Sequence, residues 1–272
     1  MTNADADKGE RHGVALGPMT FVPELRVAGT QDPWAHRKGE PRVFALLWAV
    51  YLLVAAVLTV FSVRALGYPR TSQFVFGGLS MLTLALVGIM LLWPALRLCQ
   101  AKPALPTTSA LLDLAVVLLP VHAIVWPLSM LTGWPWTVTV GLLLLVTGWG
   151  MVAAGVIAIT VQQTQRGGVH ASRLLAIIVL LVLCIAPPAF RVLAMQAGHW
   201  APSLVDLASP LSAPWALALA PEGYFPVMTR QGWLASIVPV GIGSLLLVVS
   251  GLVARFSPHD EATQSPSLLG GR

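Results

Sequence analysis

The chain has 272 residues, of which 56% are hydrophobic and only 10% are charged, and its mean hydropathy is +0.78. Soluble domains carry roughly 25% charged residues, so this composition excludes an ordinary water-soluble globular protein. The formal net charge of +5 is spread over short segments, without the long basic block or basic-aromatic stretch of a nucleic-acid-binding protein. The lipid bilayer is therefore the expected partner, and no nucleic acid is expected.

Residues 1–41 form a polar N-terminal tail with scattered glycine and proline residues. The tail includes Asp5, Lys8 and Glu10 and lacks the early apolar core of about 7–15 residues that a signal peptide needs. The first apolar run begins near Val43 and is long enough to cross a membrane. We expect this run to serve as an uncleaved anchor, with the tail in the cytoplasm.

Six apolar runs follow within residues 42–256, and each can cross about 30 Å of hydrocarbon as a helix. Backbone groups must be hydrogen-bonded within lipid, so runs of this length are expected to be helical. The sequence thus predicts an all-α, polytopic transmembrane bundle, and residues 257–272 form a short cytoplasmic C-terminal tail. The spans are placed near 43–65, 75–98, 109–131, 137–161, 173–196 and 233–255.

Lysine and arginine residues beside these runs predict the orientation. With the N-terminus inside, the cytoplasmic segments hold eight such residues and the opposite segments hold four, as the positive-inside rule favours. Both termini are then cytoplasmic. The inner set is Arg37, Lys38, Arg42, Arg97, Lys102, Arg166, Arg173 and Arg255, and the outer set is Arg64, Arg70, Arg191 and Arg230.

The connection 197–232 is a long, apolar and proline-rich outer loop. Within it, residues 207–220 make an apolar stretch of about 14 residues that contains two prolines, which is short for a membrane span. Three arrangements remain open for this stretch: it lies in the membrane interface, it re-enters the bilayer, or it spans. A spanning segment would give seven spans and place the C-terminus outside.

Asp113 is an acidic residue inside a predicted span, and ionisable residues in such places are candidates for function. It follows the cap residues Thr107, Thr108 and Ser109, about one turn inside the third run. We expect its carboxylate to be stabilised by the helix N-terminus and to reach water near the cytoplasmic interface. A role in substrate or proton handling is the alternative.

His122 is expected near the membrane midplane, between Pro120 and Pro127 of the same run. We expect a neutral imidazole that donates to a carbonyl freed by a proline kink. The alternative is a ligand-binding or proton-relay histidine. Asp113 and His122 are nine residues apart, which places them on opposite sides of an ideal helix, so we do not expect them to pair.

Pro187 and Pro188 interrupt the fifth run, and Arg191 follows one turn later. We expect a kinked helix with the Arg191 side chain extended toward the outer headgroups. The alternative is a transporter site, because discontinuous helices build such sites.

The fourth run is expected to be the main packing helix. Small residues recur in it at intervals of seven and of four, and small residues let helix backbones approach closely. These residues are Gly141, Gly148 and Gly155 in the first series and Gly150, Ala154 and Ala158 in the second.

The sequence predicts neither catalytic residues, nor a cofactor, nor a metal site. The serine and histidine of an intramembrane protease, the His-Glu-x-x-His zinc motif and the glycine-rich nucleotide loops are all missing. Two cysteines, Cys99 and Cys184, form neither a CxxC pair nor a cluster with histidine. We therefore expect a protein that is not an enzyme.

Two hypotheses follow for a protein of the bacterial cytoplasmic (inner) membrane. The first is a non-enzymatic scaffold or accessory subunit, held to protein partners in a membrane complex by its small-residue faces. The second is a permease subunit or small transporter with a site at the kinked third and fifth helices, near His122 and Arg191. Its size and span count are similar to those of permease subunits of ATP-driven exporters, but outline does not define function.

Overall fold

The computed structural model describes residues 40–65, 71–100, 105–163, 169–196, 204–219 and 225–256. Every regular element in these ranges is a helix, which confirms the all-α prediction. Residues 1–39 of the predicted N-terminal tail, the whole C-terminal tail, and Arg70, Lys102 and Arg166 lie outside the described residues. The elements in chain order are α1 (Glu40–Ala65), α2 (Thr71–Val87), the π-helical turn η2 (Gly88–Leu92), α3 (Trp93–Cys99), α4 (Pro106–Thr132), α5 (Trp136–Gln163), α6 (Val169–Gln196), α7 (Leu204–Leu207), α8 (Ala213–Ala218) and α9 (Arg230–Phe256).

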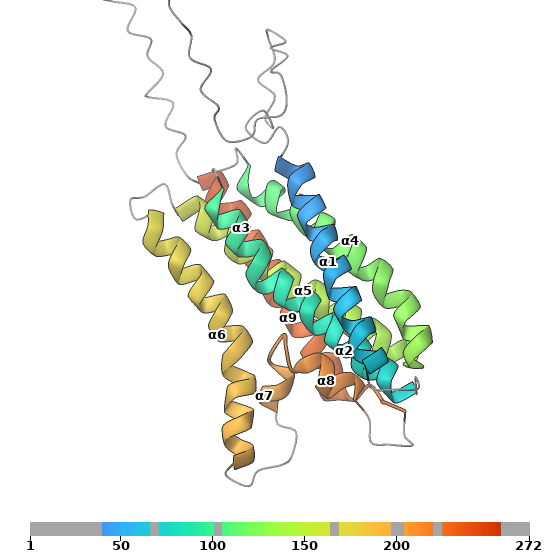
Figure 1. The fold of residues 1–272 in the computed structure, drawn as a ribbon. Coiled ribbons are helices and arrows are strands. Elements are labelled where there is room, and N and C mark those ends of the chain that lie inside the picture. Colours follow the sequence, from blue (N-terminus) through green and yellow to red (C-terminus); the bar gives the residue numbers. More distant parts are fainter. Residues whose placement is uncertain are drawn as a thin grey trace, which may run out of the picture.

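Five helical segments in the described part of the chain are long and apolar enough to cross a membrane. The first combines α2, η2 and α3, and the other four are α4, α5, α6 and α9. Helix α1 adds a shorter apolar stretch, Phe44–Thr59. Figure 1 shows these rods running side by side, with the short helices α7 and α8 near one end of the bundle. The protein is therefore an integral membrane protein built as a helical bundle.

A tight turn joins α4 to α5. Helix α4 ends at Gly133, whose φ of 69° is left-handed and therefore suits glycine. The amide of Trp134 donates to the carbonyl of Ser129 at 3.2 Å. Pro135 then accepts from the amides of Val138 and Thr139 at 3.0 Å, which starts α5. The connection makes α4 and α5 antiparallel neighbours.

Helix α1 is attached to the bundle through two aromatic residues one turn apart. Trp48 and Tyr51 stack with ring centroids 5.4 Å apart and cover Gly88, where a Cβ would lie 2.6 Å from the Tyr51 ring. The Trp48 indole donates to the carbonyl of Val117 in α4 at 3.0 Å, and the Tyr51 hydroxyl donates to that of Leu84 in α2 at 2.7 Å. These bonds fix α1 against both α2 and α4.

Helix α5 is the central element, and its closest neighbour is α9. In the most apolar 18-residue stretch of α5, 72% of the residues are buried. A Cβ on Gly148 would lie 2.7 Å from the backbone nitrogen of Val240, and one on Gly155 would lie 2.5 Å from the Cβ of Leu246. From the other side, a Cβ on Gly243 would lie 2.5 Å from the Cβ of Met151. The two backbones therefore approach through glycines of both helices.

The other small residues predicted to pack lie in the same core. Gly150 faces α4, where a Cβ would lie 2.9 Å from Leu114. Gly141 faces the flexible end of Met228, just before α9. Ala154 and Ala158 are fully buried. Small residues thus line two sides of α5, toward α9 and toward α4.

Helix α6 lies at the edge of the bundle (Figure 1), and only 17% of its most apolar stretch is buried. Helix α6 continues through Pro187 and Pro188 to Gln196, so the prolines do not make it discontinuous. Figure 1 shows instead a change of direction along α6. Pro188 cannot donate to the carbonyl of Cys184, and the Ser209 hydroxyl donates to that carbonyl at 3.4 Å. Another part of the chain thus supplies a donor that the proline lacks.

Residues 204–219 turn back into the bundle. They form α7, a turn and α8, which lie against α2, α5, α6 and α9 and do not cross the bundle (Figure 1). The Trp215 indole donates at 2.9 Å to the hydroxyl of Thr83, which is about 18 Å along the rod that begins at Thr71. Cys184, the partner of Ser209, lies about 18 Å from the end of α6. Residues 204–219 therefore fold back among the long helices without crossing the bundle, and we call them the re-entrant segment.

Candidate functional site

The first candidate, Asp113, is paired with Arg97 at the junction of α3 and α4. Arg97 donates from Nε to one carboxylate oxygen and from Nη2 to the other, the second at 2.6 Å. Its Nη1 donates to the side-chain oxygen of Gln100, and its Cζ lies 6.0 Å from the centre of the Phe44 ring. The guanidinium is thus held on several sides by residues of α1, α3 and α4.

This arrangement corrects the expectation that Asp113 reaches water at a helix N-terminus. The side chains of Arg97 and Asp113 are only 5% and 8% exposed. A bidentate arginine–carboxylate pair matches two donors to two acceptors and is stronger than neutral hydrogen bonds. The sequence assigned Arg97 only to the set of basic residues that orients the protein. Arg97 lies in the last turn of α3, where its guanidinium reaches the carboxylate of Asp113, seven residues into α4.

The second candidate, His122, bonds to Thr147 of α5. Its Nε2 lies 3.0 Å from the Thr147 hydroxyl, which in turn donates to the carbonyl of Leu143 at 2.8 Å. The expected partner, a carbonyl freed by a proline kink, is therefore wrong, because the imidazole side of α4 faces a threonine of the neighbouring helix. The contact ties α4 to α5 near the centre of both helices.

The third candidate, Arg191, forms an ion pair with Asp206 of α7, through Nη1 and one carboxylate oxygen. The Asp206 side chain is 1% exposed and that of Arg191 is 32% exposed. The expected extension of Arg191 toward the headgroups is replaced by this contact with the re-entrant segment. Asp206 also anchors the turn after α7, because its backbone oxygen accepts from the Ser212 hydroxyl at 2.7 Å.

The structure contains a further polar cluster that the sequence did not predict. Gln162, near the end of α5, donates to the hydroxyls of Thr107 in α4 and Ser250 in α9, at 3.2 and 2.8 Å. The two hydroxyls are 2.9 Å apart. Three helices are therefore joined at this point. The three residues are far apart in the chain and have no shared motif, so only the packing of the helices reveals the cluster.

The three predicted polar residues, Asp113, His122 and Arg191, do not form one site. Asp113 and His122 are separated by about 13 Å along α4 and have different partners. Arg191 belongs to α6 and the re-entrant segment. Within the described residues, no group of three or more histidine, cysteine, aspartate or glutamate side chains is arranged to hold a metal ion.

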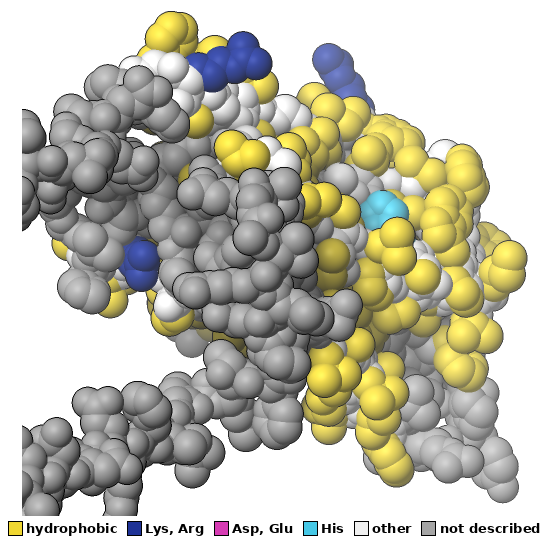
Figure 2. Space-filling model, turned by 90° about the horizontal axis from the view of Figure 1, so that it is seen from above, with side chains coloured by type: hydrophobic (Ala, Val, Ile, Leu, Met, Phe, Trp, Pro, Cys, Tyr) yellow, Lys and Arg dark blue, Asp and Glu magenta, His cyan; other side chains and the backbone are white. Residues whose placement is uncertain are grey.

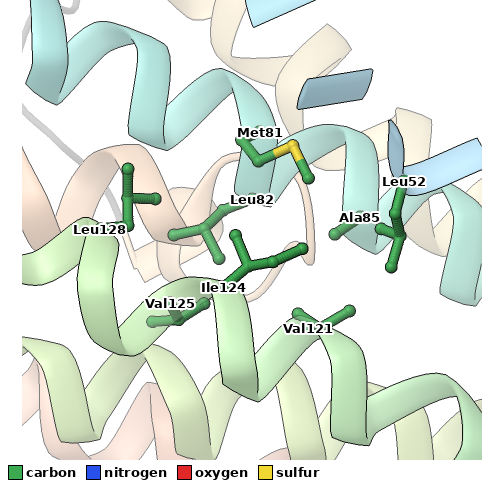
Figure 3. A pocket seen from close by; sticks show the side chains of 8 residues that line it. All are labelled: Leu52, Met81, Leu82, Ala85, Val121, Ile124, Val125 and Leu128. Atoms are coloured by element: carbon green, nitrogen blue, oxygen red, sulfur yellow. The ribbon is translucent and has the colours of Figure 1, made fainter. Parts of the chain in front are cut away.

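A small apolar pocket lies between α1, α2 and α4 (Figure 3). Aliphatic side chains line it, and it has room for little more than a water-sized molecule. A water would also need polar partners, which this lining does not offer. The lining residues are Leu52, Met81, Leu82, Ala85, Val121, Ile124, Val125 and Leu128. The pocket is a packing defect of the three helices and not a ligand site.

Comparison of the chain with protein-family models, with curated protein sequences and with solved structures finds no match.

Proposed function

We propose that this protein is a non-enzymatic scaffold or accessory subunit of a membrane complex. The observation that carries the proposal is that polar side chains within the helices bond to neighbouring helices and so stiffen the bundle. Hydrogen bonds of this kind contribute about 0.6 kcal/mol on average in a membrane protein, and more for well-placed pairs. The bonded sets are Trp48 with Val117, Tyr51 with Leu84, Arg97 with Asp113, His122 with Thr147, Thr83 with Trp215, Arg191 with Asp206, and Thr107 with Gln162 and Ser250.

In this proposal α1 also spans, which gives six spans with both termini in the cytoplasm. Helix α1 has 26 residues, and at 1.5 Å per residue its length of about 39 Å exceeds the hydrocarbon thickness. The eight-to-four excess of basic residues on the inner side supports the orientation. An uncleaved anchor and few cysteines fit a bacterial inner membrane.

A permease or small transporter is the second candidate, and one observation favours it. The re-entrant segment contacts α6 beside its two prolines, about 18 Å from the end of that helix. Non-helical backbone at this depth occurs in transporters where it lines a path for the substrate. In such a protein Arg191 and Asp206 would separate during the transport cycle, whereas in a scaffold they stay paired.

Affinity purification after crosslinking in living cells tests the proposal. A scaffold or subunit purifies as a stable assembly with other membrane proteins, and a purified monomer after mild detergent extraction would contradict this. A co-purifying ATPase would favour the permease. As a second arm, His122→Ala and Asp113→Asn are compared with the wild type at matched expression. The scaffold proposal predicts that any loss of cellular function follows a loss of protein or of assembly, without a separate loss of transport.

A further inference from the structure

The hydrogen bonds around Thr147 favour one tautomer of the His122 ring. Among the described residues, His122 has one partner, the Thr147 hydroxyl. That hydroxyl has a single proton, which it donates to the carbonyl of Leu143. Both bonds can form together only if Nε2 of His122 carries a proton and donates to Thr147. In a neutral imidazole the other nitrogen, Nδ1, is then an acceptor that receives no hydrogen bond from the described residues.

This acceptor lies deep in the membrane and at the surface of the bundle. His122 is three residues, or about 5 Å, from the middle of α4. Its side chain is partly exposed, and it is the one histidine whose side chain the structure describes. Figure 2 shows a histidine side chain at the surface, surrounded by hydrophobic side chains. Hydrocarbon tails provide no donor at this depth, so an unpaired acceptor here is unfavourable.

His122 belongs to a strip of residues on one face of α4. The strip consists of Ala115, Leu119, His122 and Trp126, spaced by four, three and four residues. The three others are exposed, with Leu119 at 74%. Residues at this spacing form a continuous line along one side of a helix. Such a line packs against a second helix at a shallow crossing angle. At the outer end, Trp126 stacks on Trp136 of α5 with centroids 5.1 Å apart, which fixes that edge of the strip.

We propose that this strip, the His122 face, binds one membrane-spanning helix of a partner protein. The partner helix carries a hydroxyl or amide group at mid-depth that donates to Nδ1 of His122. The inference rests on the proposed function as a subunit and names the surface that the complex would use. Interhelical bonds from serine, threonine, asparagine or glutamine are the usual way in which such helices recognise each other in lipid.

A second copy of the same chain does not fit this face. Two copies with the same orientation in a membrane are related by an axis along the membrane normal, which would place His122 opposite His122 at one depth. Both Nε2–H groups are already bound to Thr147, so two acceptors would meet without a donor between them. A lipid headgroup cannot reach the site either, since the middle of the bilayer is about 15 Å from the headgroups.

Photocrosslinking in living cells tests the proposal. A diazirine side chain replaces Leu119 in the full-length protein, and in a matched control it replaces Val182. Val182 is 53% exposed at the middle of α6, on another side of the bundle. We expect a discrete adduct with another membrane-spanning protein from position 119 and lipid adducts alone from position 182.

Three variants test the role of the acceptor. His122→Phe removes it, and the protein adduct should fall by about three- to tenfold, the range expected for one such hydrogen bond. His122→Asn keeps a polar atom near the position of Nδ1 and should restore the adduct. Thr147→Val disturbs the internal bond but leaves the face in place, so the adduct should change less than twofold. An unchanged unfolding transition of each purified variant confirms that the bundle is folded.

The proposal is overturned if position 119 labels only lipid, labels a second copy of the chain, or yields a protein adduct that His122→Phe leaves unchanged. The subunit proposal is judged separately, by the size of the native assembly after mild extraction. An intact assembly without the adduct rejects only the His122 face. A monomer without the adduct rejects both.

Discussion

The pair α5–α9 and the outer helix α6 are held in the bundle in different ways. Between α5 and α9 the backbones approach through Gly148, Gly155 and Gly243, and contact between closely packed atoms provides the attraction. Helix α6 buries 17% of its apolar stretch, against 72% for α5, and polar contacts with the re-entrant segment supplement its limited packing on α5 and η2. Where close packing is sparse, directional bonds provide the attachment, so the two parts should respond to different substitutions.

Among the contacts that distinguish these two parts of the bundle, the ion pair that attaches α6 should have the largest effect. Arg191→Met would leave the buried carboxylate of Asp206 without its guanidinium, and we expect a loss of about 3 kcal/mol in the free energy of unfolding, the lower end of the range for buried pairs. The lower end applies because Arg191 is one-third exposed. The measurement is an unfolding titration in mixed detergent micelles. Arg255→Met, at an exposed position near the end of α9, is the control and should change little. Equal effects of the two substitutions would contradict the role of the pair.

Substitutions at two glycines of α9, Gly243 and Gly241, test the close packing of α5 against α9. In Gly243→Ala the new Cβ would meet Met151 and the backbone of Val152 at 2.5–2.7 Å, so we expect a loss of about 1–3 kcal/mol from overpacking. In Gly241→Ala the Cβ meets nothing within 4 Å, and alanine should stabilise the helix by up to about 1 kcal/mol. Thermal unfolding of the purified proteins should therefore shift in opposite directions. If both variants behave alike, the close approach of α5 and α9 is wrong.

A smaller effect is expected where the re-entrant segment contacts α2. Thr83→Val keeps the shape of the side chain but removes the hydroxyl that accepts from the Trp215 indole. We expect a loss of about 0.6–1.7 kcal/mol, the range measured for interhelical hydrogen bonds in a membrane protein. A double-mutant cycle with Trp215→Phe isolates this bond, and additive effects of the two substitutions would show that it contributes nothing.

The smallest effect is expected at Ser209. Its bond to the carbonyl of Cys184 is 3.4 Å long, at the weak end of the range for hydrogen bonds. Ser209→Ala should therefore reduce stability by about 0.5 kcal/mol or less. The same unfolding titration measures it. If Ser209→Ala reduced stability as much as Arg191→Met, the hydroxyl would hold the segment to α6 as strongly as the ion pair does, which would contradict this ranking.

The helices could be predicted from the sequence because the length of an apolar run is a local property. The expected runs near 109–131 and 137–161 lie within α4 and α5, and the seven-residue spacing of Gly141, Gly148 and Gly155 already marked one face of the fourth run. The partners of the polar residues could not be predicted. Arg97 meets Asp113 only because the folded bundle brings these two side chains together, and no pattern in the chain encodes this.

The position of the re-entrant segment also could not be predicted from the sequence. Its composition indicated only that it was apolar, short and rich in proline, which is compatible with several depths in the membrane. Its depth is determined by contacts with distant helices, through Trp215 and Ser209. Likewise, a small rotation of α4 decides whether His122 faces a threonine of α5 or its own freed carbonyl. Such choices depend on packing between helices and not on the sequence of one helix.

The most direct test of the central claim, that the intramembrane polar groups have a structural role and bind no substrate, compares the loss of one partner of the Arg97–Asp113 pair with the loss of both. Arg97→Leu alone should destabilise the protein by about 3–5 kcal/mol, because the carboxylate of Asp113 remains buried. The double variant Arg97→Leu with Asp113→Leu should recover most of that stability in an unfolding titration and should retain cellular function. A double variant that is stable but without function would contradict the account and assign the pair to a substrate.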